Sequence, residues 1–243
     1  MARVIMIASG KGGTGKSTVA NFLSHELGFK GYKTFLTELD MGFRSIDVMS
    51  GISDKTVYDL GDVLGGSCSI EKAIVASPYT EKLHIMAAPG KKDGIRLDRL
   101  KEFVDSIYNS YDYIVIDTAA GMGEAFTSAL GCAATALVVA TPDAISVRDA
   151  RIISDEIYHS GIHDVLLVIN KYDRNTFRHS GFEDGDAIID ACCAQLLGVV
   201  PNDEHIMLSA MTGKPLTSGS LSKKVFSSMV ERLNGNHVQI NFR

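Results

Sequence analysis

The sequence lacks a Cys-x-x-Cys pair. Its four cysteines are Cys68, Cys132, Cys192 and Cys193. Structural zinc sites and dithiol redox sites commonly use that spacing, so neither is predicted. A reducing cytosol also disfavours disulfides. We expect all four side chains to be buried as small apolar groups.

Long apolar runs and an excess of positive charge are also lacking. No apolar segment approaches the roughly 20 residues that a membrane-spanning helix needs. A predicted strand begins close to Met1, which leaves no room for a signal peptide. The net charge of −5 disfavours a surface that binds nucleic acid over its whole extent, although it is compatible with a local basic patch. We therefore expect a cytoplasmic protein.

What is present is the composition of an ordinary globular protein. Of the 243 residues, 45% are hydrophobic and 22% charged, which is enough to bury a substantial core. No internal repeat, low-complexity tract or linker divides the chain, so residues 1–243 are expected to form a single domain.

Short apolar segments alternate with longer amphipathic ones through most of the chain. The predicted strands are Val4–Ala8, Thr34–Leu39, Leu83–Ala87, Tyr113–Ile116, Ala136–Ala140, Val165–Ile169 and a short one at Val199. The predicted helices are Ser17–Phe29, Arg96–Asn109, Val147–Ser160, Ala187–Leu197 and Leu221–Leu233. This alternation predicts a three-layer α/β fold with a mostly parallel sheet between helices. Ligands of such sheets bind at the carboxyl ends of the strands.

Residues 10–17 read Gly-Lys-Gly-Gly-Thr-Gly-Lys-Ser, which matches the G-x-x-x-x-G-K-[ST] phosphate-binding loop. The glycines allow backbone N–H groups to turn inward toward phosphates, and the following helix N-terminus adds further donors. Lys16 is expected to reach the β- and γ-phosphates, and the Ser17 hydroxyl to bind Mg²⁺. The predicted nucleotide-binding residues of this segment are Gly10, Lys11, Gly12, Gly13, Thr14, Gly15, Lys16, Ser17 and Thr18.

Lys11 is an additional lysine within this loop. The run K-G-G-T-G-K-S-T from Lys11 to Thr18 resembles the deviant Walker A loop of the ParA/MinD family of P-loop ATPases. In that family the extra lysine reaches across a homodimer to the partner's nucleotide. The resemblance therefore implies a homodimer on ATP binding, with Lys11 contributing positive charge in trans as an arginine finger does. A solvated lysine without a role is the alternative.

The strand Tyr113–Ile116 leads directly into Asp117. An acidic residue at this place is where a Walker B carboxylate helps to hold Mg²⁺, whereas a helix cap or turn is the alternative. Gly121 is suited to approach the γ-phosphate through its backbone amide. The family usually has Asp-x-Pro-Ala-Gly here, and Ala119 replaces the proline without removing a functional group.

The segment Thr37–Asp47 resembles switch I of the family, in which two aspartates stand two residues apart. Asp40 matches the second aspartate, which helps to position the attacking water, so the resemblance implies a catalytic role for Asp40 near the metal ion. Glu38 replaces the first aspartate and has a longer side chain. Solvated loop acids are the alternative for both residues.

Recognition of the base is expected at two further strand ends. Asn170 follows Val165–Ile169, at the place where the family's asparagine contacts adenine, and an amide both donates and accepts as the adenine edge requires. The GTPase pattern Asn-Lys-x-Asp is also present at residues 170–173. The deviant loop and the switch segments favour ATP over GTP. Pro201 belongs to a segment that resembles the family's loop against the base.

Two segments resemble parts of the family's dimer interface. They are Thr141-Pro142-Asp143 and Ser146–Arg151, within which Asp143 and Asp149 are candidate interface carboxylates. An ordinary helix cap and a first-turn acid are equally compatible with the sequence.

The resemblance spans Met1 to about Leu233, and Gly42–Asp47 and Val57–Asp59 favour the MinD branch of the family. Members of that branch usually continue into a basic amphipathic helix that lies on the membrane surface. Because the sequence ends at Arg243 without such a helix, membrane recruitment is unsupported, and a peripheral position at the inner membrane face stays open. The amphipathic helix Leu221–Leu233 is expected to pack on the core instead.

Taken together, these features imply a MinD-like, Mg²⁺-dependent ATPase with slow, partner-stimulated hydrolysis, acting as an ATP-driven dimer switch in placing the division site or in other spatial positioning. One alternative is a ParA-type segregation ATPase that binds DNA. A metal-cluster assembly ATPase is disfavoured by the missing Cys-x-x-Cys pair. A nucleotide-binding scaffold with negligible turnover is a further alternative.

Overall fold

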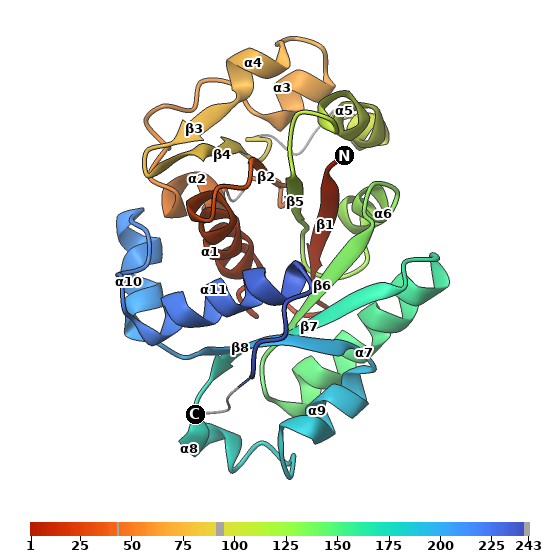
Figure 1. The fold of residues 1–243 in the computed structure, drawn as a ribbon. Helices are drawn as coiled ribbons and strands as arrows, with labels where there is room; N and C mark the ends of the chain where they lie inside the picture. Colours follow the sequence, from red (N-terminus) through yellow and green to blue (C-terminus); the bar gives the residue numbers. More distant parts are fainter. Residues whose placement is uncertain (43, 91–94, 241–243) are drawn as a thin grey trace.

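The structure, a computed structural model, describes residues 1–42, 44–90 and 95–240. Phe43, within the predicted switch I segment, and residues 241–243 of the predicted single domain lie outside the described residues. The described residues form an eight-stranded sheet with the strand order β3-β4-β2-β5-β1-β6-β7-β8 (Figure 1). The predicted α/β fold with a mostly parallel sheet is confirmed.

The strands are parallel throughout except for one edge hairpin. They are β1 (Arg3–Ala8), β2 (Thr34–Glu38), β3 (Val75–Ser77), β4 (Thr80–Met86), β5 (Tyr113–Asp117), β6 (Thr135–Ala140), β7 (Asp164–Tyr172) and β8 (Gln195–Pro201). Among the strands of the described residues, β3 alone runs antiparallel, beside β4. The central strand β1 lies between β5 and β6, so connections lead away from it on both sides. The carboxyl end of β1 therefore lies at the switch point where open α/β sheets bind ligands.

Helices cover both faces of the sheet (Figure 1). One face packs against α1 (Lys16–Phe29), α2 (Ser45–Met49), α10 (Glu204–Thr212) and α11 (Leu221–Leu233). The other packs against α3 (Leu60–Leu64), α4 (Ile70–Ala73), the 3-10 turn Leu97–Arg99, α5 (Leu100–Ile107), α6 (Glu124–Leu130), α7 (Ala144–His159), α8 (Arg174–Phe177) and α9 (Gly185–Cys192).

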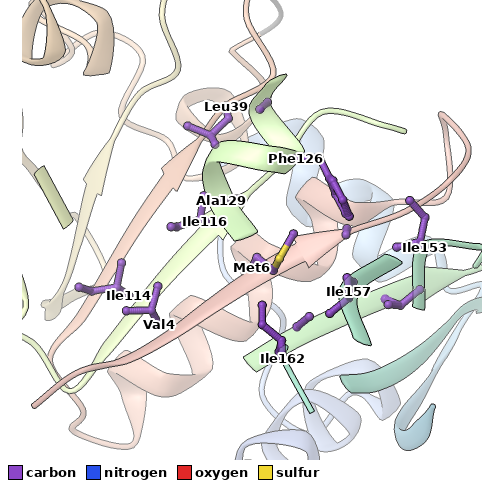
Figure 2. Packing of buried hydrophobic residues seen from close by; sticks show 14 of the residues in the cluster. Val4, Met6, Leu39, Ile114, Ile116, Phe126, Ala129, Ile153, Ile157 and Ile162 are labelled. Carbon is purple, nitrogen blue, oxygen red and sulfur yellow. The ribbon is translucent and has the colours of Figure 1, made fainter. Parts of the chain in front are cut away.

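Alternation along the strands produces the two cores. In β1, Val4 and Met6 face one core, whereas Ile5 and Ile7 face the other, because successive side chains of a strand point to opposite faces. Figure 2 shows Val4 and Met6 in the first core, together with Phe126 of α6. Since both faces are covered, the strands read as continuous apolar runs.

The structure corrects one predicted helix and one predicted burial. The helix expected over Ala187–Leu197 ends at Cys192, and Gln195 already begins β8. Cys193 has a φ of 49°, in the left-handed region, which stops the helix. The sequence prediction failed here because apolar residues of a buried strand read like a helix when periodicity is the only criterion.

The expectation that all four cysteines are buried is also wrong, since Cys193 is exposed.

The packing of α11 confirms that this helix belongs to the core. Phe226, Met229, Val230 and Leu233 are buried against the face that also carries α1. Within the part of the chain that the structure describes, no helix combines the length and the apolar character needed to cross a bilayer.

A buried histidine makes the stability of this fold depend on pH. In His25 of α1, Nδ1 lies 2.9 Å from the carbonyl oxygen of Asn21, and Nε2 lies 3.2 Å from the hydroxyl oxygen of Ser77. Burial lowers the pKa of His25 to about 4, against the opposing effect of the Asn21 carbonyl. Since the unfolded chain binds the proton more tightly, stability is fully present above pH ~6.5 and is lost as the pH falls toward 4.

We therefore expect the free energy of unfolding to drop by up to about 3 kcal/mol between pH 7 and pH 4.5 through this one group. Urea denaturation of a His25→Gln variant should show a smaller drop than the unmodified chain. The exposed His163 provides the control, because His163→Gln should leave the pH dependence unchanged. An equal drop in all three proteins would rule out His25 as the cause.

Candidate functional site

The loop between β1 and α1 leaves a helix N-terminus open to a ligand. Gly13 and Gly15 have φ angles of 81° and 91°, which glycine adopts without strain. Within the described ranges no side chain caps α1, and its first turn contains no acidic residue. The loop side of Gly12 and Gly13 is also open, since a Cβ at either position would meet no atom of the described residues within 4 Å. Backbone N–H groups and a positive dipole end are thus available to an anion.

Gly10 brings the start of this loop against α7. A Cβ at residue 10 would stand 2.6 Å from the Cβ of Asp149 and 2.8 Å from its carbonyl oxygen. Only glycine fits here without moving the loop or the helix. The candidate interface segment that contains Asp149 therefore adjoins the phosphate loop directly.

Asp117 is a buried carboxylate at the end of β5. It is fully buried, and among the described residues neither of its oxygens has a hydrogen-bond partner of ordinary geometry. Burial raises the pKa of Asp117 to about 7, although the Ser17 hydroxyl and the Lys16 charge act in the opposite direction. A buried, unpaired carboxylate beside a hydroxyl is costly by itself and fits a bound divalent cation. The residues present therefore fit Mg²⁺ held by Ser17 and Asp117.

The segment after Asp117 is tied to β1 and to the phosphate loop. The Thr118 hydroxyl donates to the Ile7 carbonyl at 2.9 Å. The Gly121 amide donates to the Ser9 carbonyl, also at 2.9 Å. An approach of Gly121 to a γ-phosphate through that amide thus requires this bond to break, and the role stays a prediction.

Glu38 has a structural function that the sequence did not indicate. Arg44, the residue before α2, has a φ of 47° and provides no side-chain cap. Instead, the buried Glu38 carboxylate accepts from the amides of Ser45 and Ile46 at 3.3 and 3.1 Å. The extra methylene of glutamate thus lets the end of β2 cap α2. Asp40 lies two residues after Glu38, between the end of β2 and the start of α2.

Burial, with smaller contributions from the neighbouring Asp40 and Asp47 charges, raises the pKa of Glu38 to about 7. The amides of Ile46 and Ser45 act in the opposite direction. The alternative interpretation of Glu38 as a solvated acid in a loop is therefore wrong.

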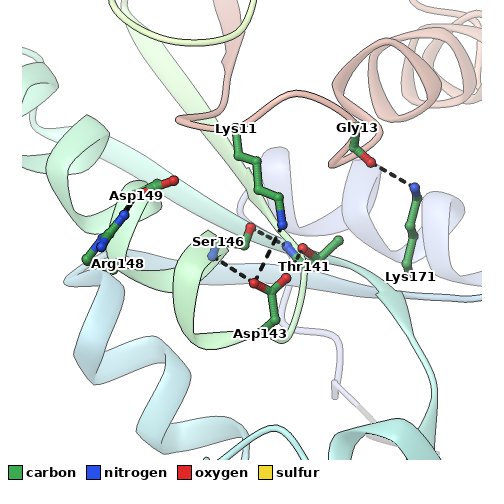
Figure 3. Close-up of polar contacts among 8 residues, drawn as sticks. All are labelled: Lys11, Gly13, Thr141, Asp143, Ser146, Arg148, Asp149 and Lys171. Atoms are coloured by element: carbon green, nitrogen blue, oxygen red, sulfur yellow. Dashed lines mark hydrogen bonds and ion pairs between the residues drawn. The ribbon is translucent and has the colours of Figure 1, made fainter.

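Lys11 points away from its own loop and toward α7 (Figure 3). Its Nζ lies 3.7 Å from Oδ1 of Asp143, and both side chains are 44% exposed. Asp143 caps α7 by accepting from the Ser146 amide at 3.0 Å and accepts from the Thr141 hydroxyl at 2.6 Å. The predicted alternative of a helix cap is thus confirmed for Asp143.

Two consecutive residues at the end of β7 hold the phosphate loop. Nδ2 of Asn170 donates to the Thr14 carbonyl at 2.7 Å. Nζ of Lys171 donates to the Gly13 carbonyl at the same distance, as Figure 3 shows. The Thr14 contact uses neither Oδ1 nor the second N–H of Asn170, so these groups could still bind an adenine edge. The contact of Asn170 with adenine stays a prediction.

A cavity follows the end of β8. It has a volume of about 640 Å³ and is lined by residues that include Pro201, Asn202, His205 and Ser220. Asp203 caps α10 and binds the Ser222 hydroxyl, which joins this loop to α11. The position of Pro201 on a cavity at the carboxyl edge of the sheet fits a place beside a base.

The fold therefore brings together most of the residues predicted from the sequence. The loop residues from Gly10 to Thr18, Asp40, Asp117, Gly121, Asn170 and Pro201 all lie at or beyond the carboxyl ends of parallel strands. Sequence reasoning missed the contact of Lys171 with the loop, although it identified the Asn-Lys pair as part of a motif. It also missed the capping of α2 by Glu38. The available signal was that a glutamate stands at residue 38 in place of the family's usual aspartate.

Comparisons with known proteins agree with this geometry. The family model described as ParA, NUBPL iron-transfer P-loop NTPase, matches residues 1–234. A putative septum site-determining protein MinD of Guillardia theta is 32% identical, over 98% of this chain and 91% of its own length. The septum site-determining protein MinD of Bacillus subtilis is 30% identical, over 99% of this chain and 92% of its own length.

Solved structures are similar over nearly the whole chain. The MinC:MinD cell division protein complex of Aquifex aeolicus contains a chain with a TM-score of 0.90 and 28% identity, with 99% of each chain covered. The septum site-determining protein MinD of Pyrococcus horikoshii, complexed with Mg-ADP, has a TM-score of 0.86 and 27% identity, with 96% of each chain covered.

Proposed function

Because the chain belongs to the ParA/MinD family of P-loop ATPases, we propose that it works as a MinD-like switch whose ATP-bound form dimerises through the face that carries Lys11. The chain is an ATPase that uses ATP and Mg²⁺. The observation that carries the dimer proposal is the direction of Lys11, whose ammonium lies beside Asp143 rather than over its own loop. A lysine at the edge of the site, nearly half exposed, is available to a second subunit.

The residues of the chain divide the work of hydrolysis. The amides of the loop and of the first turn of α1 bind phosphate oxygens, and Lys16 adds a buried positive charge. Ser17 and Asp117 would hold Mg²⁺, which would neutralise charge on the phosphates. Asp40 orients the attacking water. Positioning and charge stabilisation account for nearly all of such catalysis, so a subunit without its partner's Lys11 is expected to be slow.

The proposed output is a change of assembly and not a chemical product. The Aquifex protein occurs in a complex with MinC, and septum site-determining relatives match almost the whole chain. We therefore infer that this chain takes part in placing the division site and that its ATP-bound dimer is recognised by a regulatory protein. A peripheral position at a membrane belongs to the same proposal.

Phosphate release in Mg²⁺ and ATP tests this function, with size-exclusion chromatography and light scattering run in parallel. We expect a dimer with ATP and a monomer with ADP, and slow release that anionic liposomes or a partner increases. Salt-sensitive retention on DNA that depends on ATP would instead favour a ParA-type segregation ATPase. Transfer of an iron–sulfur cluster would favour the carrier alternative, and a binding protein without turnover would favour the scaffold.

A further inference from the structure

The Asn-Lys-x-Asp pattern at residues 170–173 is typical of guanine-binding sites, whereas the phosphate loop and the switch segments favour ATP. Its aspartate is occupied, since Asp173 caps α8 by accepting from the amide and the hydroxyl of Thr176, both at 2.8 Å. We propose that Asn170 and Lys171 form a brace that orients the phosphate loop, with Lys171 as a positioning residue for ATP binding and hydrolysis. The inference rests on nucleotide binding by residues 10–17.

The two contacts fix consecutive peptide groups of the loop. Lys171 binds the carbonyl of Gly13 and Asn170 binds the carbonyl of Thr14, each at 2.7 Å. In a planar trans peptide the carbonyl and the following N–H point in opposite directions. Because Lys171 and Asn170 bind these two carbonyls, the following N–H groups, those of Thr14 and Gly15, point away from β7. Donors that are aimed before the ligand arrives bind an anion without the cost of ordering them.

The strand that carries the brace is adapted to it. The pairing of β7 with β8 is irregular between Ile169 and Tyr172, the interval that contains both brace residues. Lys171 also has a φ of 56°, in the left-handed region that a lysine rarely adopts. Glycine would adopt this conformation without strain. A lysine is therefore expected here for its ammonium group and not for its backbone.

Gly15 shows how closely the brace approaches the loop. A Cβ at residue 15 would lie 2.2 Å from Nδ2 of Asn170 and 3.9 Å from Cε of Lys171. Gly15 thus serves two requirements, a φ of 91° and room for the asparagine amide. The phosphate loop therefore packs directly against the side chains at the end of β7, with no room for a side chain at residue 15.

Three variants of Lys171 separate the brace from the backbone strain. Lys171→Gly removes the ammonium group and relieves the strain, Lys171→Ala removes the group alone, and Lys171→Arg keeps a donor of similar reach. We expect Lys171→Gly to unfold at an unchanged or higher urea concentration while its affinity for a fluorescent ATP analogue falls about tenfold. Lys171→Arg should restore most of that affinity.

A matched control relieves the same kind of strain elsewhere. Cys193 also has a positive φ, 49°, at the end of α9, so Cys193→Gly should leave ATP affinity and hydrolysis unchanged. All variants should keep the ratio of ATP to GTP affinity of the unmodified chain. Normal ATP affinity and kcat in Lys171→Gly would overturn the brace, and so would an increased preference for GTP. Failure of the unmodified chain to bind ATP would instead overturn the proposed function.

Discussion

Replacing Lys16 with methionine is expected to lower ATP hydrolysis by a factor on the order of 10³, with weaker binding of ATP. Lys16 is buried at the first position of α1, and its charge acts on the fully buried Asp117. Methionine keeps an unbranched side chain but leaves the phosphates without this positive group. Because Lys16 is itself buried, the lost charge is not readily replaced by water.

Isothermal titration with ATP and Mg²⁺, together with phosphate release under saturating ATP, measures both effects. The control is Lys101→Met, since Lys101 lies exposed on α5 and pairs with Asp105, one helical turn away. That variant should bind and hydrolyse ATP normally. If Lys16→Met retained more than a tenth of the normal rate at saturating ATP, Lys16 would not be a catalytic residue.

Lys11→Ala is expected to abolish ATP-dependent dimerisation and to reduce hydrolysis by about 10³-fold, the scale of a charge supplied in trans. Binding of ATP to the single chain should remain, because Lys16 and the loop amides are untouched. Stability should also remain. The contact of Lys11 with Asp143 is an exposed pair at 3.7 Å, and such pairs contribute about 0–1 kcal/mol.

The combination of unchanged stability and lost assembly is what distinguishes a trans role from damage to the loop. Light scattering with ATP measures the assembly, urea denaturation the stability, and analogue fluorescence the binding. Lys101→Ala controls for the loss of one surface charge. A Lys11→Ala chain that dimerises on ATP like the unmodified protein would contradict the proposed role of Lys11.

The comparison of Lys11 with Lys171 shows how two loop-associated lysines differ. Lys11 reaches outward to a half-exposed carboxylate, whereas Lys171 reaches the loop from the end of β7. The sequence made the first visible because its position inside an eight-residue motif is informative by itself. The second was visible only as part of a guanine-type pattern, and its contact with Gly13 spans 158 residues.

The sequence by itself determined the layered α/β fold, the phosphate loop and the place of Asp117. These depend on local patterns, since strand and helix periods and the glycine-lysine-serine spacing lie within short contiguous segments. The tertiary structure alone decided that Glu38 caps α2, that Gly10 adjoins Asp149 and that Asn170 holds Thr14. Those contacts join residues brought together only when the strands pair side by side, and no local pattern encodes which carbonyl or amide a distant side chain will meet.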